Sequence, residues 1–115
     1  MMSRRRERPR AYIYKAVIDV KPTTEGGPKS ALESPVWSFR ATVTQREEAY
    51  QIGIVTESGE ALDPGARAEK VSIWFFDPPV GSNVEPGTAV RLWVLDRVVG
   101  SGLLIGFERS VEPDS

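Results

Sequence analysis

Carboxylates are the side chains of this 115-residue chain that could do acid–base chemistry. Asp19, Glu33, Asp77 and Asp96 could pair for such work, yet most of them fall in turn-like stretches or at solvent-facing strand positions, where carboxylates are hydrated. The chain has no histidine and no cysteine, which removes the usual general base, the commonest zinc ligand, thiolate nucleophiles and disulfides. The sequence therefore predicts a protein that is not an enzyme and that holds no metal and no cofactor.

Three glycines near the C-terminus are the next candidates, because glycine-rich loops can cradle phosphates. Gly100, Gly102 and Gly106 match neither the dinucleotide-binding nor the P-loop spacing, no lysine follows them, and the segment leads into a strand instead of a helix. The sequence predicts a structural turn here and no nucleotide site. At Gly100 and Gly102, glycine would permit a positive φ or a close approach of two strands.

Positive charge is concentrated at the N-terminus. Residues 1–15 hold six arginines and lysines against one glutamate, a net charge of +5, whereas the whole chain carries −1 and the remainder therefore −6. The basic arm consists of Arg4, Arg5, Arg6, Arg8 and Arg10. It could tether nucleic acid, because each arginine placed on a phosphate releases counterions; the alternative is a solvated tail. The acidic remainder argues against a broad RNA-binding face elsewhere.

Alternation of apolar and polar residues between turn signals recurs along the chain, as is typical of an all-β barrel or sandwich. Strands are expected over residues 12–21, 36–44, 51–56, 69–76, 89–95 and 103–108. In the second strand, the side chains expected to face the core are Trp37, Phe39, Ala41 and Val43. Residues 1–10 and 110–115 have too few apolar side chains to pack, so flexible ends are expected on either side of a single domain over residues 11–109.

Large aromatic side chains are expected on the outside of this domain. The alternation in residues 71–76 leaves Trp74 and Phe76 outward, and the alternation in residues 90–94 leaves Trp93 outward beside Arg91. An exposed apolar patch of this kind marks contact with another protein or with a second copy of the chain. The alternative is that the loops at residues 22–35 and 77–88 fold over these aromatics.

Several segments resemble, in order and spacing, the C-terminal β-barrel (domain 3) of elongation factor Tu-like translational GTPases. They are residues 12–20, the Glu25-Gly26-Gly27 loop, the Pro35-Val36-Trp37-Ser38-Phe39-Arg40 strand, Ile52-Gly53-Ile54-Val55, Pro64-Gly65, residues 91–95 and residues 97–104. The resemblance covers residues 11–109 and implies a six-stranded antiparallel Greek-key β-barrel. A nucleotide domain does not fit in the same 115 residues, so the barrel is expected to stand alone.

The resemblance leaves two functions open. In the family, the double-glycine loop and the final glycine turn meet the T-stem of aminoacyl-tRNA; here Pro28 stands where an arginine is usual and Lys29 where a histidine is usual. We expect a non-catalytic module that binds a protein partner or itself through Trp74, Phe76, Arg91 and Trp93; the partner would belong to the translation apparatus or recognise such barrels. The alternative is a tRNA or structured-RNA binder that uses Lys29, Arg40, the Gly100–Gly102 turn and the basic arm. No apolar run suits a membrane span or a secretory signal, so a cytoplasmic protein is expected.

Overall fold

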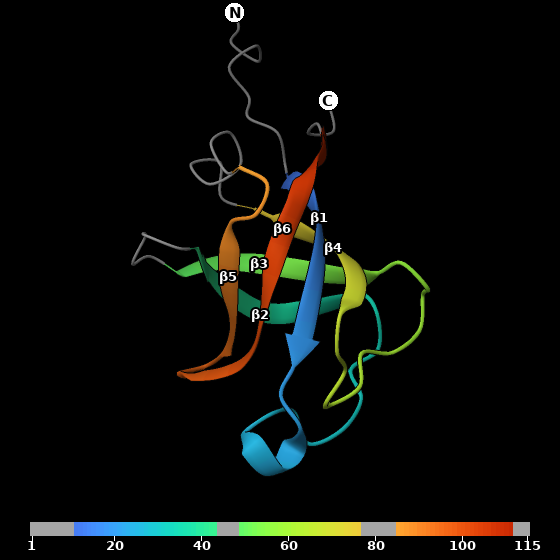
Figure 1. The fold of residues 1–115 in the computed structure, drawn as a ribbon, viewed down its shortest axis with the longest axis vertical. Helices are drawn as coiled ribbons and strands as arrows, with labels where there is room; N and C mark the ends of the chain where they lie inside the picture. The colour runs from blue at the N-terminus through green and yellow to red at the C-terminus, as the bar shows by residue number, and fades with distance from the viewer. Residues whose placement is uncertain (1–10, 44–48, 77–84, 112–115) are drawn as a thin grey trace, which may run out of the picture.

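Six β-strands form a closed antiparallel barrel in the computed structural model, which describes residues 11–43, 49–76 and 85–111 (Figure 1). The strands are β1 (Ala11–Val20), β2 (Val36–Val43), β3 (Ala49–Thr56), β4 (Glu69–Phe75), β5 (Ala89–Val94) and β6 (Arg97–Val111). Their order around the barrel is β1-β4-β3-β2-β5-β6. Because β2, β3 and β4 follow one another while β1 returns beside β4, this order is a Greek key. The expected six-stranded antiparallel barrel is confirmed.

The first and last strands lie next to each other. In Figure 1, β1 and β6 run side by side, and β2 and β3 cross behind them. Their ladder extends from the pair Ala11 and Val111 at one end to the pair Val20 and Gly100 at the other. β6 is much longer than β5, and its residues beyond Leu104 pair with β1 alone among the described strands. The barrel is therefore closed tightly by β1 and β6.

Alternate side chains of each strand fill the interior. Val71, Ile73 and Phe75 of β4 are fully buried, as expected, and so are Val90 and Leu92 of β5. The largest fully buried side chains are Tyr14, Phe39 and Phe75. Each strand has one face toward the interior, and β-branched and aromatic residues pack well on such a pleated, half-buried surface. The alternation of apolar and polar residues therefore located the strands.

Trp37 was expected in the core, and that expectation is wrong. Val36 of β2 pairs with Ile54 of β3 and Phe39 pairs with Ile52, so Trp37 and Ser38 together stand opposite the single residue Gly53. Such a β-bulge inserts one extra residue and shifts the alternation. Val36 and Phe39 consequently both face inward, and 47% of Trp37 is exposed on the outside.

The expected glycine turn is also wrong, because the turn lies earlier in the chain. β5 ends at Val94, Leu95 (φ 56°) and Asp96 form the turn, and Gly100 and Gly102 lie inside β6. Neither glycine has a positive φ. A Cβ on Gly100 would lie 2.5 Å from the carbonyl oxygen of Asp19, so glycine is needed there for close approach of β1 and β6.

The expected flexible ends fall largely outside the described residues. The basic arm over residues 1–10 and the last four residues, 112–115, belong to this undescribed part, and β6 itself continues to Val111. Within the part of the chain that the structure describes, no helix has the length and apolar character needed to cross a membrane.

Candidate functional site

The four residues expected to form one partner surface lie on two different sides of the barrel. Trp74 belongs to β4 and Phe76 follows it, whereas Arg91 and Trp93 belong to β5. β4 and β5 are three strand positions apart in either direction around a six-stranded barrel. The two pairs therefore face away from each other, and the structure does not bring them together.

Trp74 and Phe76 instead gather with Trp37. The ring centroids of Trp37 and Trp74 are 5.9 Å apart at an interplanar angle of 82°, and those of Trp37 and Phe76 are 6.0 Å apart at 51°. Edge-to-face and tilted arrangements at this distance are favourable aromatic contacts. We call Trp37, Trp74 and Phe76 the aromatic cluster; it lies on the outside of β2, β3 and β4.

Gly53 makes room for the aromatic cluster. It is the ladder partner of Trp74 and stands opposite the bulge that contains Trp37. A Cβ at this position would overlap the six-membered ring of Trp37. The Trp37 ring therefore lies across the bare backbone of β3 and reaches the edge of Trp74 on the next strand.

Arg109 borders the aromatic cluster on the side of β1. Its guanidinium carbon lies 5.9 Å from the centroid of Trp74, within the range of a cation–π contact. Ile13 of β1 pairs with Arg109 on one side and with Trp74 on the other, and its side chain is buried. Glu108 lies 3.8 Å from Arg109 and accepts a hydrogen bond from Ser72 at 3.2 Å. The cluster is thus bordered by the ion pair of Arg109 and Glu108.

The aromatic cluster offers substantial binding energy. Trp37 is 47% exposed and Phe76 is 41% exposed. Burying the exposed half of both rings would remove roughly 170 Å² of surface and contribute about 4 kcal/mol before the costs of association. Trp37 and Trp74 come from strands of a closed barrel and Phe76 directly follows one, so little conformational entropy would be lost on binding.

Trp93 is held in place by the neighbouring strand. Its Nε1 donates a hydrogen bond of 3.1 Å to Oγ1 of Thr42, and its ladder partner on β2 is Arg40. The ring is partly buried, while Arg91 and Arg40 are exposed. This side of the barrel therefore presents guanidinium groups more than free aromatic surface.

The residues expected to bind RNA do not form one described surface. Lys29 is exposed in the loop between β1 and β2, and Arg40 is exposed on β2. Gly100 and Gly102 belong to the interior side of β6, opposite Val20 and Ile18 of the core. The arginines of the basic arm lie outside the described residues.

The carboxylates are dispersed. Asp19 accepts a hydrogen bond of 2.7 Å from the backbone N–H of Ala68 and lies 3.8 Å from Nε of Arg67. Glu33 is in the β1–β2 loop and Asp96 is in the β5–β6 turn, while Asp77 is outside the described residues. Within residues 11–43, 49–76 and 85–111, no group of three or more acidic residues could hold a metal ion.

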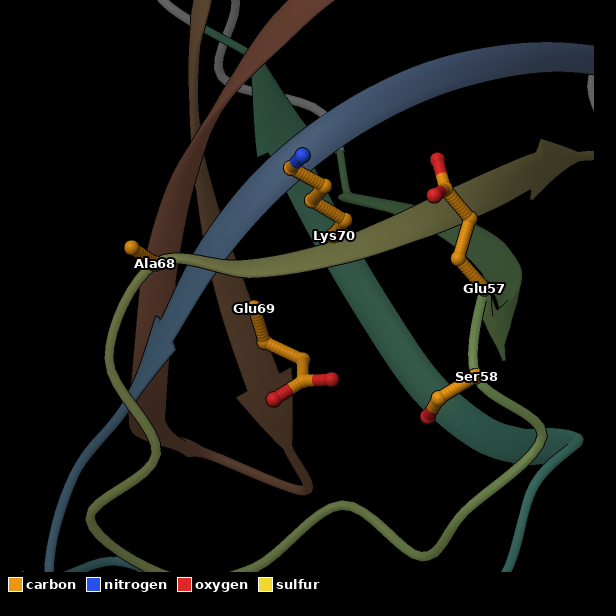
Figure 2. A pocket seen from close by; sticks show the side chains of 5 residues that line it. All are labelled: Glu57, Ser58, Ala68, Glu69 and Lys70. Carbon is orange, nitrogen blue, oxygen red and sulfur yellow. The ribbon is translucent and has the colours of Figure 1, made fainter.

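A hollow of about 390 Å³ lies where β3 leaves the barrel and β4 enters it. Figure 2 shows Glu57 and Lys70 pointing toward one side, whereas the carboxylate of Glu69 points to the other. The hydroxyl of Ser58 accepts a hydrogen bond of 3.1 Å from the N–H of Glu60. The charged groups diverge, so the hollow does not assemble an acid–base pair or a nucleophile.

Sequence reasoning found two residues of the aromatic cluster and missed Trp37, Arg109 and the supporting Gly53. A signal for Gly53 existed, because a glycine inside the β-branched run Ile52-Gly53-Ile54-Val55 often marks a bulge or a close approach. No feature of the sequence indicated that Arg109 would border the cluster. A scan against protein-family models and a search of curated proteins both return no match.

Proposed function

We propose that this protein is a non-catalytic binding module that recognises a protein partner through the aromatic cluster. The observation that carries the proposal is the pair of half-exposed rings, Trp37 and Phe76, which contact each other outside a closed barrel, with Trp74 edge-to-face against Trp37. Energetically dominant residues at protein interfaces are enriched in tryptophan and arginine. The cluster contains two tryptophans, and Arg109 at its border lies over Trp74.

The barrel architecture supports a wider form of the proposal. A closed six-stranded antiparallel barrel is what a relative of elongation factor Tu domain 3 requires. On this basis the protein would be cytoplasmic, and its partner would belong to the translation apparatus or recognise such barrels. A second copy of the chain is the other occupant that the same surface would accept.

The test compares variants of the exposed rings with an equally apolar control. A partner is first cross-linked to the purified protein in extract from the native cell, identified by mass spectrometry, purified, and titrated by calorimetry. Phe76→Ala and Trp37→Ala should each weaken its binding at least about tenfold, which corresponds to about 1.4 kcal/mol. Leu95→Ala is the control, because Leu95 is 86% exposed but belongs to the β5–β6 turn.

Urea unfolding of each variant checks that the fold is intact. All three variants should retain a cooperative transition. Unchanged affinity in both ring variants would remove the aromatic cluster as the binding surface. Loss of binding in Leu95→Ala alone would move the surface to the β5–β6 turn.

A further inference from the structure

A groove runs along the outside of β5, β6 and β1, the three strands that the aromatic cluster does not occupy. Two hollows of about 470 and 240 Å³ form it, and they share Asp19, Arg91 and Ser101. These three residues are ladder neighbours, with Ser101 of β6 between Asp19 of β1 and Arg91 of β5. We call this feature the β6 groove.

The larger hollow of the β6 groove has an apolar floor. Leu103 of β6 is 52% exposed, and its ladder partners are Val17 on β1 and Ala89 on β5. Ser101 and Leu103 are two residues apart and point to the same side, so their spacing is about 6.6 Å. The polar and the apolar position of the groove are thus separated by the distance between alternate residues of an extended peptide.

Arg91 is an unpaired charge of the β6 groove. Among the described residues, its side chain has no ion pair or hydrogen bond, whereas the carboxylate of Asp19 is engaged by Arg67 and by the N–H of Ala68. At the other end of the groove, Lys21 and Arg67 are accompanied by Glu25 and Asp19. The guanidinium of Arg91 therefore adjoins the apolar floor without a bound carboxylate among the described residues.

We propose that the β6 groove binds an extended segment of a partner protein with an acidic residue two positions from an aliphatic one. The carboxylate lies against the guanidinium of Arg91 and the hydroxyl of Ser101, and the aliphatic side chain covers Leu103 and Val17. Charge-assisted hydrogen bonds to arginine are strong and directional, which selects the carboxylate. A nucleic acid would instead require a continuous cationic track with freely stacking rings, and this groove has one free guanidinium beside apolar side chains.

The probe is an acetylated, amidated octapeptide with the sequence Asp-Thr-Leu-Thr repeated twice, and its control carries Asn in place of Asp. Each is titrated into the full chain, and binding is followed by amide chemical shifts in NMR spectra. The Asp peptide should shift the amides of Ser101 and Leu103, and the Asn peptide should bind at least about tenfold more weakly. Arg91→Gln should produce the same tenfold loss. Arg97→Gln removes an equal charge from β6 outside both hollows and should change the affinity less than about twofold.

Other outcomes overturn the proposal. Equal binding of the two peptides, no shifts with either, or shifts confined to the aromatic cluster would each do so. A dodecamer of uridylate that shifts Ser101 and depends on Arg91 would assign the groove to nucleic acid. Phe76→Ala should leave the response to the Asp peptide unchanged, so this result is independent of the test of the aromatic cluster. Because Arg91 is exposed, a thermal midpoint near that of the parent should accompany the Arg91→Gln result.

Discussion

Gly53 determines where the most exposed tryptophan lies. The missing Cβ lets the Trp37 ring rest on the backbone of β3, and from there it reaches both Trp74 and Phe76. Other small residues would also suit an outward strand position, but only glycine leaves space for the Trp37 ring. A single hydrogen in place of a methyl group therefore decides whether three aromatics form one surface.

Gly53→Ala should displace the Trp37 ring without damaging the core. Because the ring is half exposed and can swing outward, we expect the free energy of unfolding to change by less than about 1 kcal/mol. The aromatic ring shifts of Trp37 and Trp74 in NMR spectra should change, and partner binding should weaken. In a Trp37→Ala background the overlap disappears, and Gly53→Ala should become neutral or stabilising by about 0.4–1 kcal/mol. An additive double-mutant cycle would contradict the contact between the two residues.

The orientation of most strand residues followed from alternation alone, whereas the orientation of Trp37 did not. In β4 the pattern holds without interruption, and Val71, Ile73 and Phe75 lie where it placed them. In β2 the pattern fails because a bulge depends on the register with β3, which no local spacing contains. The separation of the β4 and β5 aromatics has the same origin, since it depends on the strand order.

At the level of elements, β6 is the strand that the sequence described least well. Its glycines suggested a turn, because glycine is the usual turn residue. In the structure, Gly100 and Gly102 continue the strand and bring it against β1, while Leu95 and Asp96 make the turn. Glycine as a turn former and glycine as a close-packing residue look the same in a sequence; the partner strand distinguishes them.

Alanine at two glycines of β6 should have opposite effects. Gly100→Ala places a Cβ 2.5 Å from the backbone carbonyl oxygen of Asp19, and backbone cannot move aside as a side chain can. We expect the free energy of unfolding to fall by about 2–3 kcal/mol, measured by urea denaturation. Gly106→Ala is the matched control, because no atom lies within 4 Å of its Cβ, and it should be neutral or slightly stabilising. Similar effects at both positions would show that strand propensity, and not close approach, dominates.

At the level of the whole molecule, the barrel presents two unlike halves. Strands β4, β3 and β2 carry the aromatic cluster, and strands β1, β6 and β5 carry the β6 groove. Two partners could occupy these halves without meeting, and each would contact strands fixed by the same core. The proposed module would thus be able to bind two partners at the same time.

Any attraction to RNA should come from the basic arm and not from the barrel. The chain beyond residue 15 carries a net charge of −6, which repels a polyanion. Weak tRNA binding, measured by filter retention at increasing salt, should fall log-linearly and should disappear when the five arginines of the arm are replaced by glutamine. Arg40→Gln should leave it unchanged. A loss of binding in Arg40→Gln would instead place the RNA on the barrel and support RNA binding as its function.

The pairing of Ala11 with Val111 has a consequence for how this domain can be connected to others. Ladder partners have Cα atoms about 5 Å apart, so a very short linker would join these two residues and turn the barrel into a closed loop of chain. The break could then be moved to the turn at Leu95 and Asp96, which is exposed at the other end of β6. For the same reason the barrel could be inserted into a surface loop of a host protein without stretching it, because its entry and exit lie side by side.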